Sequence, residues 1–154
     1  LLNCRIDGFN NNRPDLFIID LKLRLKKKLY WNNYLNLRKI FLITSKKNSN
    51  KIQAYKKLGY KFIFVNKLEH KNDFYLLYKK IYKIGYSRIL VEAGLTFLNS
   101  LIKSKMIHDL YIFKSKKKLG KNGKNNILIH LIKKIKAKLI TINLIDDKLY
   151  KKEF

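Results

Sequence analysis

The chain of 154 residues has one cysteine, one proline, one methionine and only ten acidic residues. Because Cys4 has no second cysteine to pair with, a disulfide framework within the chain is excluded, and a reducing compartment is favoured. No unbroken apolar run approaches the ~20 residues that a membrane-spanning helix needs. The first residues also lack the basic-then-apolar layout of a signal peptide. The sequence therefore predicts a soluble protein of the cytoplasm.

What the chain has in excess is lysine. It carries 36 basic residues, a formal net charge of +26, and 47% hydrophobic residues, which is enough apolar material for one folded domain. Only five of the basic residues are arginine, the residue that reads phosphates and guanine edges bidentately. Abundant Lys, Asn and Ile with scarce Ala and Pro indicate a genome rich in A and T. Solvated lysine is thus favoured over a nucleic-acid surface, and a basic nucleic-acid-binding α/β module built on residues 114–138 remains the alternative.

Short apolar runs alternate with helical patterns through the middle of the chain. Residues 16–20, 40–44, 61–65, 88–91 and 109–113 have the composition of buried strands. Residues 50–58, 73–84 and 95–105 carry apolar side chains at helical spacing, with Ser49 or Asn50 and Asn72 or Asp73 as candidate N-caps of the first two. Gly59 and Gly85 are expected to end those two helices in the left-handed conformation. Such alternation predicts parallel strands joined by crossover helices.

The two ends of the chain differ from this pattern. Residues 1–14 are polar and predict an irregular arm, and residues 21–39 predict a connection without clear periodicity. Residues 139–145 and 148–154 flank Asp146 and Asp147 and predict an antiparallel hairpin. The overall prediction is a single three-layer α/β domain over residues 1–154, with a mostly parallel central sheet, helices on both faces and a C-terminal antiparallel hairpin.

One strand-to-helix turn stands out as a candidate ligand site. In an open α/β sheet the ligand lies beyond the carboxyl ends of the strands. There, Glu92 ends a predicted strand, Gly94 would let a ligand approach the backbone, and Thr96 adds a hydroxyl near a helix start that favours phosphate. Taken alone this pattern favours ordinary turn chemistry over a ligand site.

Other common sites are not indicated. The three histidines are scattered without a second ligand at metal spacing, so no metal site is predicted. The chain has no GxGxxG, GxxxxGK[ST] or GxSxG motif. Aromatic side chains at helical spacing favour a packed core over a platform for stacking bases.

Several segments, taken together, resemble the sequence motifs of one known family. Residues 88–105, RILVEAGLTFLNSLIKSK, and residues 106–123, MIHDLYIFKSKKKLGKNG, resemble the V-E-G/A-G, P-T-L, V-D-E-L and P-K-L-L-G segments of the reductase domain of the bifunctional riboflavin-biosynthesis deaminase-reductases. Residues 1–5 resemble the end of that family's D-D-P-x-L-x-x-R segment, and residues 17–25 resemble its V-V-L-D-S-x-L-R-L strand. The segments occur in the family's order along nearly the whole chain.

This resemblance implies a dihydrofolate-reductase-like fold and an NADP-dependent oxidoreductase. In such an enzyme NADPH reduces the ribosyl group of 5-amino-6-(5-phosphoribosylamino)uracil to the ribityl product. It implies substrate contacts by Leu2, Arg5 and Glu92, with Arg5 suited to the phosphate. It implies cofactor binding by the turn made of Gly94, Leu95, Thr96, Phe97, Leu98, Asn99 and Ser100. It also implies a homodimer, and zinc only in a deaminase half; no catalytic residue is assigned.

The chain departs from the family pattern at three positions. Leu95 replaces a Pro of the family, Leu21 replaces a Ser that would touch the cofactor, and Lys116 replaces the Pro of the P-K-L-L-G loop. The cofactor site is therefore expected to differ from that of the family. The family's first strand, its G-x-G-T turn and the zinc deaminase would precede Leu1. The chain is therefore expected to be the carboxyl part of a longer multifunctional enzyme, active when that portion is supplied, or an inactive remnant of it.

Overall fold

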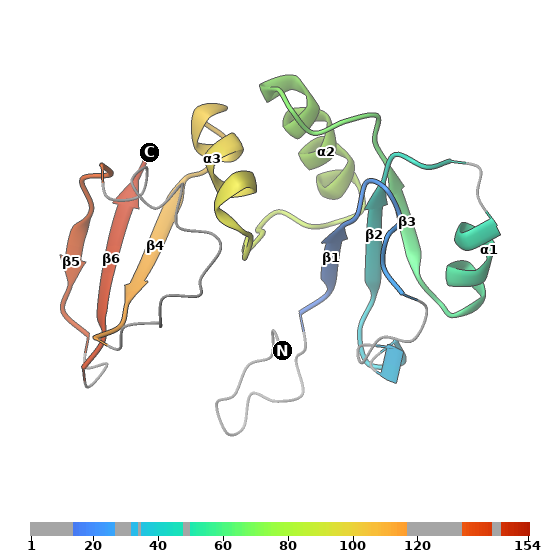
Figure 1. Ribbon diagram of the computed structural model, residues 1–154, viewed down its shortest axis with the longest axis horizontal. Coiled ribbons are helices and arrows are strands. Elements are labelled where there is room, and N and C mark those ends of the chain that lie inside the picture. Colours follow the sequence, from blue (N-terminus) through green and yellow to red (C-terminus); the bar gives the residue numbers. More distant parts are fainter. Residues whose placement is uncertain (1–13, 27–31, 34, 48–49, 117–133, 143–145) are drawn as a thin grey trace. The chain divides into compact units, whose positions relative to one another are not determined.

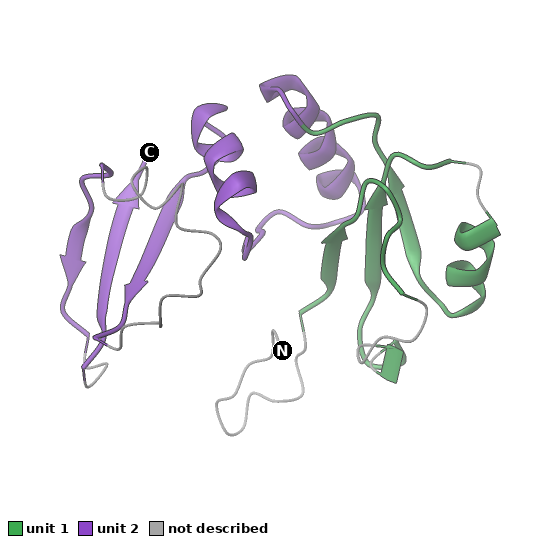
Figure 2. Cartoon of the chain, viewed as in Figure 1, with its two compact units in different colours: residues 1–68 green, residues 69–154 purple. Residues whose placement is uncertain are grey.

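The computed structural model describes residues 14–26, 32–33, 35–47, 50–116, 134–142 and 146–154 (Figure 1). The chain divides into two compact units, Leu1–Leu68 and Glu69–Phe154 (Figure 2). Each unit is built around its own three-stranded sheet.

The first unit holds a parallel sheet. Its strands are β1 (Leu16–Ile19), β2 (Ile40–Thr44) and β3 (Lys61–Phe64), in the order β1-β2-β3. Leu16 pairs with Ile40, and Phe41 pairs with Lys61. Helix α1 (Asn50–Lys57) connects β2 to β3. The predicted parallel strands and their crossover helix are confirmed here.

The core of the first unit lies between α1 and one face of the sheet. Ile40 and Leu42 are fully buried and pack in one cluster with Ile52 and Tyr55 of α1. On the other face the rings of Phe17 and Phe41 stack with centroids 4.7 Å apart. Because every residue of β2 is buried, this strand is covered on both faces, which accounts for its unbroken apolar run.

The second unit contains α2 (Lys71–Lys83), α3 (Leu95–Lys103) and an antiparallel sheet. That sheet consists of β4 (Asp109–Lys114), β5 (Lys138–Ile140) and β6 (Lys148–Glu153), in the order β4-β6-β5. The two helices meet where the rings of Phe74 and Phe97 pack edge to face at 5.7 Å. The predicted C-terminal hairpin is confirmed as the pair β5 and β6.

Four expectations are wrong in detail. Residues 88–91 form no strand, and β4 pairs antiparallel with β6 where a parallel neighbour was expected. The N-cap of α2 is His70, and Asp73 lies one turn later, where its carboxylate accepts the backbone N–H of His70 at 3.0 Å. The mixed α/β class is confirmed, but the described strands form two sheets of three, one parallel and one antiparallel, in place of one mostly parallel sheet.

The glycine stops are confirmed. Gly59 has φ of +97° and Gly85 has φ of +101°, a region that residues with a Cβ rarely adopt, and each lies two residues after the last residue of its helix, α1 or α2. Among the residues that the structure describes, no helix is long and apolar enough to cross a membrane.

Candidate functional site

The turn after β1 lies at the carboxyl edge of the parallel sheet. The carbonyl oxygen of Leu21 accepts hydrogen bonds from Thr44 Oγ1 at 3.1 Å, Ser45 Oγ at 2.8 Å and Ser45 N–H at 3.1 Å. These donors lie at the end of β2, so they fix the turn against the neighbouring strand. Leu21, which stands where the resembling family has a Ser, therefore contributes its backbone to this edge while its side chain is half-buried.

Glu92 lies on an extended segment that precedes α3 in the second unit. The sequence predicts that Glu92 ends a strand. That is wrong, because residues 86–94 are not in a strand and Glu92 is exposed. Among the described residues no ion pair or hydrogen bond occupies the Glu92 carboxylate, so its oxygens are available to accept hydrogen bonds from a ligand.

Gly94 is the N-cap of α3, and its surroundings are open. Its φ of −65° and ψ of 160° are ordinary for any residue, so the glycine is not required by backbone conformation. A Cβ at this position would meet nothing within 4 Å. Within the described part of the chain, no side chain caps the helix start. The site therefore has room for a group that approaches the backbone at the start of α3.

The first turn of α3 presents backbone amides that donate to no acceptor among the described residues. The helix ladder begins with Leu98 N–H, which donates to the carbonyl of Gly94 at 3.1 Å, so the amides of Leu95, Thr96 and Phe97 precede the first helical acceptor. Together with the helix dipole they form the kind of N-terminus that binds phosphate groups. The Leu95 that replaces the family's Pro adds one further N–H to this set.

Side chains of the predicted cofactor turn divide into two groups. Thr96 is exposed, whereas Phe97 is half-buried against Phe74 and serves packing. Ser100 donates its hydroxyl hydrogen to the carbonyl of Thr96 at 3.1 Å, which ties it to the helix itself. Leu98 and Asn99 are half-buried. The turn can thus hold a ligand mainly through backbone amides.

Most of the remaining predicted positions are not described by the structure. Leu2 and Arg5 lie outside the described residues, as does most of the lysine-rich stretch 114–138. Lys116, which replaces a family Pro, is exposed and forms an ion pair with Asp146 at 2.5 Å. The described part of that stretch therefore offers no surface that supports the nucleic-acid-binding alternative.

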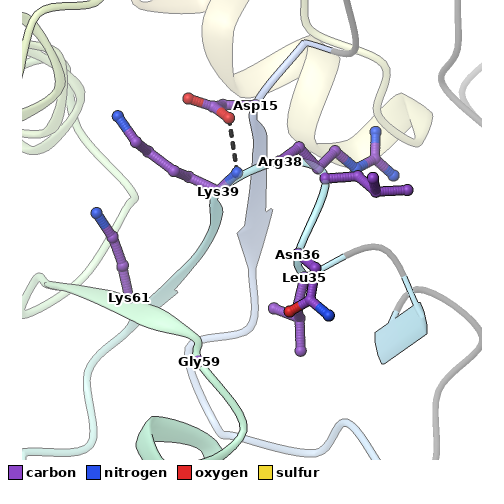
Figure 3. Close-up of a pocket in the computed structure, with 8 residues that line it drawn as sticks. Asp15, Leu35, Asn36, Arg38, Lys39, Gly59 and Lys61 are labelled. Atoms are coloured by element: carbon purple, nitrogen blue, oxygen red, sulfur yellow. Dashed lines mark hydrogen bonds between the residues drawn. The ribbon is translucent and has the colours of Figure 1, made fainter. Parts of the chain in front are cut away.

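Sequence reasoning missed an open pocket of about 480 Å³ at the opposite, amino edge of the parallel sheet. Figure 3 shows residues that line it; Asp15 Oδ1 accepts the backbone N–H of Lys39 at 2.7 Å. Lys39 and Lys61 extend toward one side and Arg38 toward the other (Figure 3), so the cations do not converge on one point. The sequence signal that could have indicated this pocket is the presence of basic residues just before β2 and at the start of β3.

Within the described ranges no group of three His, Cys, Asp or Glu side chains is placed to hold a metal ion. The family model of the RibD C-terminal domain matches residues 1–150. No curated protein matches the chain.

Proposed function

Because the chain belongs to the RibD C-terminal domain family, we propose that it is an NADPH-dependent reductase acting on 5-amino-6-(5-phosphoribosylamino)uracil. Membership in this family makes it an oxidoreductase domain of riboflavin biosynthesis. The substrate, the cofactor and the residues that hold them are the proposal. The observation that supports it most directly is the open, uncapped start of α3 at Gly94.

The described residues fit a dinucleotide. A pyrophosphate bound through main-chain amides requires a close approach to the backbone, and the empty space beside Gly94 provides it. The free amides of the first turn supply donors, and the helix dipole favours negative charge. A lysine-rich surface further raises the local concentration of anionic ligands.

In the proposed reaction the protein residues bind and orient the cofactor and the substrate. NADPH, when bound, supplies the hydride, so the protein supplies binding and orientation. Gly94 and the amides of the first turn hold the cofactor's pyrophosphate. The Glu92 carboxylate accepts hydrogen bonds from hydroxyl or ring N–H groups of the substrate and thereby orients the ribosyl carbon. Arg5 pairs with the substrate phosphate.

The direct experiment replaces Glu92 with Gln, which keeps the shape and removes the charge. We expect kcat/KM for the uracil substrate to fall about tenfold or more, equivalent to about 1.4 kcal/mol, with the folding transition unchanged because the side chain is exposed. Glu69→Gln is the matched control, since it removes the same charge from an exposed position of the same unit. Equal activity of both variants would remove Glu92 from the site.

Two further parts of the proposal derive from family membership. We expect the protein to work as a homodimer, which light scattering on the purified chain would test. We also expect it to act in the cytoplasm, where the reduced cofactor and a phosphorylated pyrimidine are available; localisation of a tagged chain would test this.

A further inference from the structure

Helix α2 carries aromatic side chains of two kinds. Phe74 is buried together with Leu77 and Ile81, and these residues form the inward face of the helix. Tyr75 and Tyr82, in contrast, are 54% and 70% exposed. Their separation of seven residues is nearly two helical turns, about 10.5 Å along the axis, so both rings lie on one side of the helix. Packing in the core therefore accounts for Phe74 but not for these two tyrosines.

Exposed lysines lie on the same side of α2 as these tyrosines. Lys71 and Lys79 are four residues before and four residues after Tyr75, and both are exposed. Tyr82 follows Lys79 by three residues. Because residues three or four apart are neighbours on a helix surface, the four side chains form one continuous stripe. We call it the Tyr–Lys stripe; its members are Lys71, Tyr75, Lys79 and Tyr82.

The positive charge of the Tyr–Lys stripe is not balanced by acids of the same helix. The only acid of α2 is Asp73, whose carboxylate accepts the backbone N–H groups of Glu69 and His70 at the helix start. After Asp73 the next acid in the sequence is Glu92. Among the described residues, no hydrogen bond or ion pair engages the side chains of the stripe. The stripe is thus suited to an anionic partner.

The composition of the stripe favours one class of anionic partner over two others. An acidic protein is disfavoured because lysine is depleted in the central part of protein–protein interfaces. A membrane surface is disfavoured because a membrane-bound helix inserts its apolar face, and the apolar face of α2 is buried in the protein. Single-stranded nucleic acid offers both phosphates and unpaired bases, and the bases stack on exposed aromatic rings. Alternating lysine and tyrosine supplies a contact for each of these groups.

We propose that the Tyr–Lys stripe of α2 binds single-stranded RNA. Tyr75 and Tyr82 stack on bases, and Lys71 and Lys79 contact phosphates. RNA is favoured over DNA because each exposed tyrosine carries a hydroxyl that can bond to the ribose 2′-hydroxyl beside the stacked base. No residue of the stripe belongs to the turn at Gly94, so this activity is separate from the proposed reductase reaction and does not rest on it.

The first experiment tests the stacking contacts. A fluorescein-labelled oligouridine RNA of about 12 nucleotides is titrated with the purified chain, and the Kd is measured by fluorescence anisotropy. Tyr75→Leu and Tyr82→Leu should each raise the Kd about tenfold, because leucine keeps helix propensity but removes the ring. Tyr111→Leu is the matched control; Tyr111 is 48% exposed on β4 of the same unit, and its loss should leave the Kd within about twofold. A wild-type chain that does not bind the RNA, or equal effects of the three substitutions, would overturn the proposal.

The second experiment separates a lysine of the stripe from diffuse positive charge. The Kd is measured from low to physiological salt for wild type, Lys79→Gln and Lys103→Gln, since Lys103 is an exposed lysine at the end of α3. Loss of one phosphate contact should lower the slope of log Kd against log salt by about 0.7 in Lys79→Gln and leave it unchanged in Lys103→Gln. Equal slopes in the two variants would show that RNA is attracted by lysines wherever they lie, and the proposal would be wrong.

The third experiment identifies the nucleic acid. The RNA strand is compared with the DNA strand of the same sequence and with the RNA annealed to its complement. Wild type should bind the single-stranded RNA about threefold or more tightly than either, because a duplex hides the base faces and DNA lacks the 2′-hydroxyl. The double variant Tyr75→Phe with Tyr82→Phe keeps the rings, so it should bind DNA as wild type does and lose the preference for RNA. Its folding should be unchanged in urea, because both side chains are exposed. Duplex RNA bound as tightly as the single strand would refute stacking, and equal binding of RNA and DNA by wild type would refute the assignment to RNA.

Discussion

The space beside Gly94 leads to a prediction that separates folding from binding. Gly94→Ala adds one methyl group at the start of α3. Its φ and ψ, −65° and 160°, lie in a region that alanine adopts freely, and a Cβ there meets no atom within 4 Å. The folded chain without ligand can therefore accept the change. A ligand that approaches the backbone at this point cannot.

The effect on stability can be estimated from two opposing contributions. Alanine is a poorer N-cap than glycine, which costs about 0.5 to 1 kcal/mol. Alanine also restricts the unfolded chain, which stabilises the fold by about 0.4 to 1 kcal/mol. The net change in the free energy of unfolding should stay within about 1 kcal/mol. Gly94→Ser adds the same Cβ together with a hydroxyl that can cap the helix, so it should be at least as stable as Gly94→Ala.

The assay is the dissociation constant of NADPH, measured by fluorescence, beside urea unfolding of the same samples. Both variants should bind NADPH at least tenfold more weakly, because the added Cβ occupies the space required for approach to the amides of the first turn. Two variants that fold and bind NADPH as the wild type does would refute the close approach and with it the cofactor role of this turn.

Two further predictions concern stability. Asp73→Ala should lower the free energy of unfolding by about 1 kcal/mol in urea, because its carboxylate accepts the backbone N–H groups of Glu69 and His70 at the start of α2, whereas Asn72→Ala on the same turn should change it little. Burial of the ring, together with the Asp20 charge, raises the pKa of Tyr55, so the folded state holds the hydroxyl proton more tightly than the unfolded state, whose pKa is near the usual 10.0. The stability advantage of wild type over Tyr55→Phe should thus be constant below about pH 10 and shrink as the pH rises above it.

Two kinds of element were predictable from sequence: a strand that is buried along its whole length, and a helix end that is marked by the residue type itself. Strand β2 is buried along its whole length, so its composition alone identifies it, and its predicted bounds are those observed. Gly59 and Gly85 mark helix ends because the backbone there needs positive φ, a property of the residue type. Such signals depend on no distant partner.

Features that depend on partners far along the chain were not predictable. The turn at Leu23 is held by side chains of Lys51 and Tyr55, which lie 28 and 30 residues from the carbonyls that they bind. Nothing in the local sequence distinguishes such a turn from an ordinary connection. The cap of α2 was missed for a related reason, since the position before a helix favours Ser, Thr, Asp or Asn, and His70 is none of these.

At residues 88–91 the local sequence predicts a strand that the structure does not contain. Ile89, Leu90 and Val91 have strand composition, yet they are 40%, 80% and 40% exposed and pair with no strand among the described residues. An apolar run supplies strand propensity, but the ladder of hydrogen bonds has to come from a neighbouring strand.

This difference can be measured at Leu90. Because its side chain is 80% exposed, Leu90→Asn should change the free energy of unfolding in urea by no more than about 0.5 kcal/mol. Leu42→Ala is the reference, since Leu42 is fully buried in β2 and its truncation should cost about 2 to 5 kcal/mol. A loss of about 2 kcal/mol or more in Leu90→Asn would mean that this side chain is buried in the folded protein.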